Sequence, residues 1–211
     1  MAEKYSNVPN RYLRGCKMDA TEARRRWHLT LDWRIEEDVD GILEESQPNF
    51  FKIKECYPHY FHNWSRDGHP VYYERVGYVD KKKMKEYGIT VPMLLRHYVF
   101  ITEYLWRKLD PDEDAGASIS IMDVENVGLR DLMGDTLEFL SMSSKIIQGH
   151  YVERCHKIFV INAPFLFNAV WRAVQPMVHE NTRKKIFILG SSRKELFDCI
   201  DPSQVPVAYG G

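Results

Sequence analysis

Hydrophobic residues are densest between positions 157 and 190, where their pattern predicts a strand, a helix and a second strand. The two flanking runs, Ile158–Ile161 and Ile186–Leu189, are short and rich in β-branched and aromatic residues. Such runs are typical of strands that are covered on both faces in a parallel sheet. The segment between them is long enough for a crossover helix, so we expect a right-handed βαβ unit.

The helix expected between Pro164 and Val178 is more hydrophobic than a surface helix needs to be. Its strongly polar residues are Asn168, Arg172 and Gln175, and their spacing places them on one narrow stripe. An apolar arc of roughly 100° is enough to cover a sheet, and this helix exceeds it. Two interpretations follow. Either the helix is sandwiched between the sheet and another helix, or one of its sides faces an apolar partner that is not protein.

Helical patterns elsewhere complete an α/β domain. Asp19, with Glu22 three residues on, has the form of a helix N-cap. Apolar residues at helical spacing predict longer helices at residues 20–37, 90–109 and 129–147. Gly149 is expected to stop the last of these. Ser192 is expected to cap one more short helix that runs through Cys199.

The strand at residues 118–124 carries polar side chains in an apolar setting. Ser118 and Ser120 share one face of the strand, and Ile119 and Ile121 share the other. An unpaired buried hydroxyl costs roughly 1–3 kcal/mol. The two hydroxyls must therefore bond each other, the backbone, water or a ligand.

An earlier stretch predicts a second strand. Asp67-Gly68 is a tight-turn signal after an aromatic run, and the strand-like residues 71–76 follow it. Pro70 stands at the first position of that strand, where its missing N–H is tolerated.

Length and charge limit the classes of protein to which the chain can belong. Its 211 residues fit one α/β domain with a small helical appendage. Lys plus Arg (29) and Asp plus Glu (30) nearly cancel, so no global basic field argues for nucleic acid. The basic run at residues 81–85 is either a solvated helix end or a contact for an anionic membrane surface. No apolar run approaches the ~20 residues of a membrane span, so we expect a soluble protein.

Common signatures of catalysis and of metal binding are absent from the sequence. It has no glycine-rich dinucleotide or nucleotide motif, no nucleophile elbow and no HExxH zinc motif. Ser191 and Ser192 follow Gly190 at a strand-to-helix junction, and we interpret them as helix-capping residues. His59 and His62 would bind a metal only if the fold supplied a third ligand. The four cysteines lack a CxxC pair and favour reduced thiols in a cytosolic protein. We expect no catalysis, no cofactor and no metal.

Separated segments in a consistent order carry a resemblance to a known family. They are RYLRGCKMDATEA, YPHYFHNWSRDGHPVYYERVG, SIMDVENVG, INAPFLFNAVWRAVQPMVHENTRKKIFILGSS and VPVAYGG. Together they resemble the Sec14-like family, whose lipid-transfer unit is the CRAL-TRIO domain. The resemblance implies a partial helical N-terminal lobe over residues 1–47 and an α/β lobe over residues 48–211. The mostly parallel sheet of the second lobe would form the floor of a phospholipid-sized apolar cavity.

A mobile gate over that cavity is also implied by the resemblance, at residues 165–178. The gate would supply the missing partner of the unusually hydrophobic helix, because its inner side would face acyl chains. The residues expected to line the gate and the acyl pocket are Phe165, Phe167, Val170, Trp171, Val174, Met177 and Val178.

Two headgroup sites are implied as well. For phosphatidylinositol the family uses an arginine of the N-terminal lobe, a glutamate before the third core strand, and a threonine and a lysine after the gate. The matching residues are Arg34, Glu153, Thr182 and Lys185. The two cations and the threonine hydroxyl suit a phosphate, and the carboxylate suits ring hydroxyls or the orientation of a cation.

For phosphatidylcholine the family uses two strand hydroxyls and two tyrosines. Ser118, Ser120 and Tyr72 match, whereas Phe61 stands at the other tyrosine position and lacks the hydroxyl. Ile35 is a second departure, because a lysine often follows the preceding Trp-Arg pair. The helical lobe also starts part-way in, so its first helices are absent or lie outside this chain.

The resemblance implies exchange of phosphatidylinositol, and of a second lipid such as phosphatidylcholine, between membranes without covalent chemistry. It further implies a cytoplasmic protein that contacts Golgi or endosomal membranes transiently, with lipid kinases as candidate partners and no nucleic acid. Two alternatives stay open. One is a lipid-sensing module that presents phosphatidylinositol to a kinase or another partner, and the other is a hydrolase that acts on a lipid.

Overall fold

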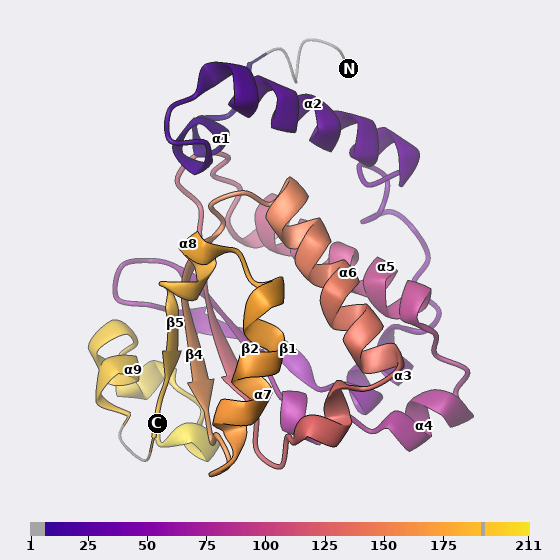
Figure 1. The fold of residues 1–211 in the computed structure, drawn as a ribbon, viewed down its shortest axis with the longest axis vertical. Helices are drawn as coiled ribbons and strands as arrows, with labels where there is room; N and C mark the ends of the chain where they lie inside the picture. The colour runs from indigo at the N-terminus through magenta and orange to yellow at the C-terminus, as the bar shows by residue number, and fades with distance from the viewer. Residues whose placement is uncertain (1–6, 191–192) are drawn as a thin grey trace.

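The computed structural model describes residues 7–190 and 193–211 and contains a five-stranded sheet with helices on both faces (Figure 1). Helices α1 (Asn10–Gly15) and α2 (Ala20–Glu36) lie together at one end of the molecule. Ser191 and Ser192, for which we expect helix capping, lie outside the described residues.

The strands of the sheet follow each other in chain order. They are β1 (His59–Trp64), β2 (Pro70–Glu74), β3 (Ser118–Asp123), β4 (Cys155–Ile161) and β5 (Ile186–Ile188). The β1–β2 pair is antiparallel and every later pair is parallel. Helix α7 (Phe167–Val174) connects the parallel neighbours β4 and β5. The predicted α/β fold with a mostly parallel sheet is therefore confirmed.

The two faces of the sheet have different neighbours. Ile119 and Ile121 of β3 pack in a core on one face, together with Leu196 of α9 (Lys194–Cys199). The opposite face, which carries Ser118 and Ser120, looks across a cavity toward α5 (Val91–Tyr104), α6 (Asp135–His150) and α7. The predicted alternation of β3 holds. One face of the sheet therefore packs against a hydrophobic core, and the other lines a cavity.

The remaining helices are α3 (Phe50–Cys56), α4 (Lys81–Glu86) and α8 (Glu180–Arg183). The start of α2 agrees with its sequence, because the Asp19 carboxylate accepts the backbone N–H groups of Thr21 and Glu22 at 3.0 Å. Helix α5 continues into a π-helical turn that ends at Leu109, which matches the predicted end.

The helix predicted over residues 129–147 is two elements. A 3-10 turn covers Leu129–Leu132, and α6 begins after Gly134. Gly134 has φ +58°, in the left-handed region that glycine enters without steric cost. The prediction that Gly149 stops this helix is wrong, since α6 passes through it to His150. Glycine inside a helix costs about 1 kcal/mol relative to alanine and does not by itself end it.

Helix α7 is shorter than the segment 164–178 predicted for it. It ends at Val174 and gives way to a 3-10 turn over Gln175–Met177. Pro176 lies in that turn. Helix α7 ends before it because proline has no N–H to donate and its ring clashes with the preceding helical turn. Helix α8 then begins after His179, whose side chain caps it.

Candidate functional site

A cavity of about 380 Å³ lies between the sheet and helices α5, α6 and α7. Ligand pockets have volumes of roughly 300–1,000 Å³. A row of residues that pair with one another across the five strands forms part of its floor: Phe61, Tyr72, Ser120, Ile158 and Ile186. Because side chains alternate along a strand, the pairing register brings all of them to the hollowed face.

One side of α7 forms a wall of this cavity. The lining residues from this segment include Phe167, Val170, Trp171, Val174, Met177 and Val178. Asn168 and Arg172 are exposed on the other side of the helix. The structure thus shows α7 between a cavity and the surface, and not sandwiched between the sheet and another helix. Phe165 differs from its prediction, because it is 97% exposed and does not line the cavity.

Glu153, Thr182 and Lys185, three of the four residues expected at a phosphatidylinositol headgroup, all line this cavity. The Lys185 Nζ lies 3.0 Å from Glu153 Oε2 and donates to the Cys155 carbonyl at 2.7 Å. The Thr182 hydroxyl has no hydrogen-bond partner in the part of the chain that the structure describes. It is therefore free to bond a ligand.

Backbone conformation places these side chains. Glu153 has φ +57° in the tight turn between α6 and β4, a left-handed conformation that is uncommon outside glycine. Non-glycine residues held there cluster at ligand-binding positions. Lys185 leads into β5, and its carbonyl accepts from the Ile158 N–H at 2.8 Å. The lysine is therefore anchored to the sheet.

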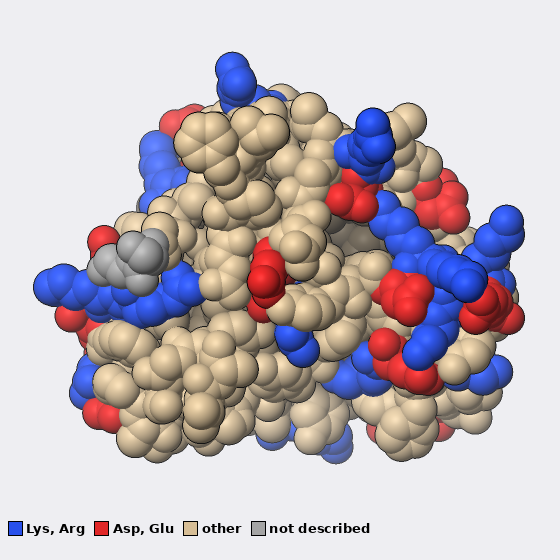
Figure 2. Space-filling view, turned by 90° about the horizontal axis from the view of Figure 1, so that it is seen from below, with Lys and Arg blue, Asp and Glu red and all other residues tan. Residues whose placement is uncertain are grey.

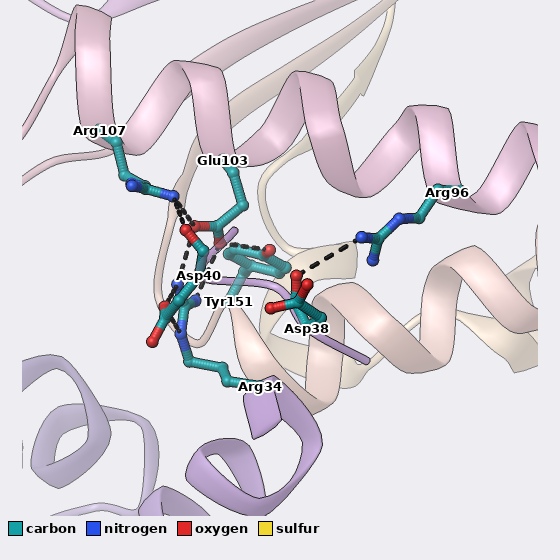
Figure 3. A network of polar contacts seen from close by, with 7 residues as sticks. All are labelled: Arg34, Asp38, Asp40, Arg96, Glu103, Arg107 and Tyr151. Atoms are coloured by element: carbon teal, nitrogen blue, oxygen red, sulfur yellow. Dashed lines mark hydrogen bonds and ion pairs between the residues drawn. The ribbon is translucent and has the colours of Figure 1, made fainter. Parts of the chain in front are cut away.

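Arg34 lies outside this group, in a separate polar network that joins α2 to α5 (Figure 3). Both terminal nitrogens of its guanidinium donate to the Glu103 carboxylate at 2.9 Å, and Nε donates to Asp40 at 2.9 Å. Tyr151 donates to the same Glu103 carboxylate at 2.6 Å. Burial alone would lower the pKa of Arg34, but Glu103 and then Asp40 raise it. Arg34 does not line the cavity, so the structure does not bring it together with the other predicted headgroup residues.

Arg26 is a cavity-lining cation that the sequence reasoning missed. It lies one turn of α2 from the buried Ala23 and one turn from the buried Thr30. That spacing was the available signal, since residues three and four apart share a helix face.

The predicted hydroxyl cluster is assembled on the floor of the cavity. Tyr72 and Ser120 pair across β2 and β3, and Ser118 lies on the same face of β3. Among the described residues, the hydroxyls of these three side chains have no hydrogen-bond partner. The ring of Phe61 lies 5.1 Å from that of Tyr72. The hydroxyls are therefore presented to the cavity and are not bonded to one another.

Glu74 is a buried carboxyl that the sequence reasoning also missed. It lies two positions after Tyr72 on the same face of β2, lines the cavity, and accepts a hydrogen bond from Tyr57. Burial raises the pKa of Glu74, while the hydrogen bond from Tyr57 opposes that shift. The period of two along a strand was the signal that could have found it.

The two histidines considered as metal ligands do not come together. His59 Nε2 lies 2.9 Å from His97 Nε2, whereas His62 contacts Asn63. Across the described ranges no group of three or more His, Cys, Asp or Glu side chains is arranged to hold a metal ion. No helix in those ranges is long and apolar enough to cross a membrane.

A mostly parallel sheet with an apolar cavity between it and a short helix defines an α/β domain with an internal cavity of ligand size. Residues 54–211 match the family model of the CRAL/TRIO domain. The chain belongs to the CRAL/TRIO domain family.

Several known proteins are similar to the chain. It is 35% identical to the SEC14 cytosolic factor of Eremothecium gossypii, over 95% of the chain and 67% of that protein. It is 30% identical to the phosphatidylinositol/phosphatidylcholine transfer protein SFH7 of Arabidopsis thaliana, over 95% of the chain but only 38% of the length of that relative. Among solved structures, that described as the crystal structure of Sfh5 has a TM-score of 0.71 at 19% identity. The similarity extends over 88% of this chain and 64% of the chain in that structure, and it supports the fold alone.

Proposed function

We propose that the protein binds phosphatidylinositol in this cavity and exchanges it, together with a second phospholipid such as phosphatidylcholine, between membranes without covalent chemistry. The observation that carries the proposal is that one apolar cavity presents two polar clusters. One is the Glu153–Lys185 pair with Thr182, and the other is the Tyr72–Ser120 row of the sheet. The names of the Arabidopsis relatives support this pairing of lipids.

Apolar walls and polar clusters have separate roles in lipid exchange. Burial of an acyl chain gains about 0.8 kcal/mol per methylene, but the chain leaves an equally apolar bilayer, so the two terms nearly cancel. Selection between lipids must come from headgroup contacts. The barrier to transfer is exposure of the chains to water, and a gate at α7 that opens at the membrane would lower it.

An apolar area beside α7 is suited to that membrane contact. Phe165 is 97% exposed and Leu166 is 73% exposed, and the neighbouring turn exposes Leu129 and Met133. Figure 2 views this end of the molecule and shows a broad area with few charged side chains. We propose a cytoplasmic protein that contacts membranes transiently through this area, and the name SEC14 cytosolic factor supports the location.

The basic run at residues 81–85 adds little net charge to that surface. Lys81 pairs with Asp131, Lys82 with Glu86, and Lys83 with Glu55. A solvated, internally paired helix end explains this run better than an anionic-membrane contact does.

Transfer of labelled lipids between liposomes tests the two-site assignment. Replacing Thr182 and Lys185 with alanine should abolish phosphatidylinositol transfer and largely spare phosphatidylcholine transfer. The reverse is expected for Ser118→Ala with Ser120→Ala. Lys184→Ala is the matched control, because Lys184 is exposed and, among the residues that the structure describes, pairs only with Glu180. Equal loss of both lipids in both double variants would contradict the proposal.

The same assay separates the alternatives. A lipid-sensing module would hold phosphatidylinositol tightly but exchange it slowly, and a hydrolase would release fatty acid from an ester substrate. Mass spectrometry of the lipids that co-purify with the protein identifies the second ligand directly.

A further inference from the structure

Arg26 lies at the same end of the cavity as the Glu153–Lys185 pair. Its guanidinium donates to the Gln148 carbonyl at 2.6 Å and contacts Cys16 Sγ at 3.9 Å. Gly15, next to Cys16, is so close to Glu153 that a Cβ placed on it would lie 3.6 Å from Glu153 Cγ. The segment after α1 therefore connects Arg26 with the wall that carries Glu153.

The charge on Arg26 has no paired carboxylate. In the described part of the chain, no Asp or Glu oxygen lies within 4.0 Å of its guanidinium. Glu22, one turn earlier in α2, is held by Arg25 at 2.7 Å through two hydrogen bonds. Lys185 is balanced by Glu153 at 3.0 Å. Arg26 therefore places a positive charge at this end of the cavity with no described carboxylate in ion-pair contact.

The remaining donors of Arg26 suit a phosphate. A guanidinium carries five N–H groups in a planar fork, and its protein contacts use one carbonyl and one thiol. Arginine binds phosphates through two parallel hydrogen bonds, which are stronger than those between neutral groups. Arg34 offers no such capacity, because Glu103 and Asp40 already bind its fork.

We propose that Arg26, and not Arg34, is the arginine that holds the phosphate of an anionic phospholipid headgroup in this cavity. This inference rests on the proposed function and adds the residue that sets its preference for an anionic lipid. The phosphate lies between Arg26 on one side and Lys185 with Thr182 on the other, and Glu153 accepts from the hydroxyls of the headgroup.

A contact with the gate region follows from the same geometry. The Gln148 carbonyl accepts from Arg26, and the Gln148 side chain donates to the Met177 carbonyl at 2.8 Å. Met177 belongs to the turn that follows α7. Arg26 is therefore tied, through one residue of α6, to the segment that covers the acyl chains.

The test compares Arg26→Gln with Arg24→Gln in the full chain. Arg24 is exposed on the same helix and has no hydrogen bond or ion pair among the described residues. Arg26→Gln should weaken phosphatidylinositol binding and transfer about 10- to 100-fold, as expected for the loss of a hydrogen bond between charged groups. It should leave phosphatidylcholine transfer within about twofold of wild type. Arg24→Gln should match wild type for both lipids, and Arg26→Lys should recover part of the loss.

Each other outcome has a defined meaning. Unchanged phosphatidylinositol transfer in Arg26→Gln overturns this inference and leaves the proposed function intact. Parallel loss of both lipids with a lower melting temperature shows that Arg26 only stabilises the fold, and also overturns it. A wild-type chain that neither binds nor transfers phosphatidylinositol overturns the inference and the proposed function together.

Discussion

Removal of the Arg34 guanidinium should lower the free energy of unfolding by about 3 kcal/mol without changing which lipid is selected. The Glu103 side chain is 3% exposed, and Arg34 bonds both of its carboxylate oxygens at 2.9 Å. Breaking a buried ion pair costs about 3–5 kcal/mol, because the remaining charge is left uncompensated. Glu103 would keep its hydrogen bond from Tyr151 at 2.6 Å and a distant Arg107 at 4.0 Å. The cost should therefore fall at the lower end of the range.

Denaturant unfolding of Arg34→Met, and of Arg34→Met combined with Glu103→Met, measures this cost. For a chain of this size 1 kcal/mol corresponds to roughly 2–4 °C in melting temperature, so the single variant should melt about 6–12 °C lower. The double variant should recover much of the loss, because apolar pairs of similar volume replace buried ion pairs at little net cost. A single-variant cost below about 1 kcal/mol, or a double variant less stable than the single, would refute the reasoning. Selective loss of phosphatidylinositol transfer at unchanged stability would place Arg34 in the headgroup site.

Three further perturbations test other parts of the structure. Burial, together with two nearby arginines, lowers the pKa of His150 from 6.5 to about 4. The free energy of unfolding that this neutral histidine contributes above pH 6.5 should therefore be lost as the pH falls toward 4. Denaturant titrations should show that the free energy of unfolding of His150→Asn depends less on pH over this range than that of wild type. The same dependence on pH in both proteins would contradict this. Because burial raises the pKa of Glu74 in the folded state, ionisation of its carboxyl group lowers the free energy of unfolding above that pKa. Glu74→Gln should unfold at higher denaturant than wild type at neutral pH and lose that advantage in acid, and a less stable variant at pH 7 would oppose it. Phe165→Ser should slow lipid transfer about 10-fold at unchanged lipid content. Ile35 on α2 is 79% exposed, and Ile35→Ser should leave the transfer rate unchanged. Equal transfer rates for the two variants would exclude Phe165 from membrane contact.

Local rules predicted the parts of the fold that depend on neighbouring residues. The alternation of β3 assigned Ser118 and Ser120 to one face and Ile119 to the other, since a strand has a fixed period of two. The start of α2 followed from Asp19 for the same reason, because the cap bonds lie within three residues. Element ends were less predictable. The break at Gly134 and the extension through Gly149 depend on tertiary packing, which decides what a glycine does.

Arg34 and Arg26 show why the positions of the candidate headgroup residues could be predicted only in part. Both arginines lie on α2, but eight residues at about 100° each separate their directions by about 80°. The partner that holds Arg34 is Glu103, which is 69 positions away on α5. Nothing in the local sequence indicates that contact. Glu153, Thr182 and Lys185 were expected together only from the resemblance to the Sec14-like family, and in the structure they flank β4 and β5, whose pairing brings the ends of the two strands together.

Charge, more than the number of hydroxyls, distinguishes the two polar clusters. Phe61 lacks the hydroxyl of a tyrosine but keeps an aromatic face beside Tyr72, 5.1 Å away, and aromatic faces attract quaternary ammonium groups. The buried carboxyl of Glu74 lines the same part of the floor, where its ionised form would repel an anionic headgroup. Arg26 contributes a positive charge near the other cluster, and no carboxylate among the described residues forms an ion pair with it. We therefore propose that an anionic headgroup is favoured beside Arg26 and a zwitterionic one beside Tyr72, which would let a single cavity discriminate between two lipids whose acyl chains are identical.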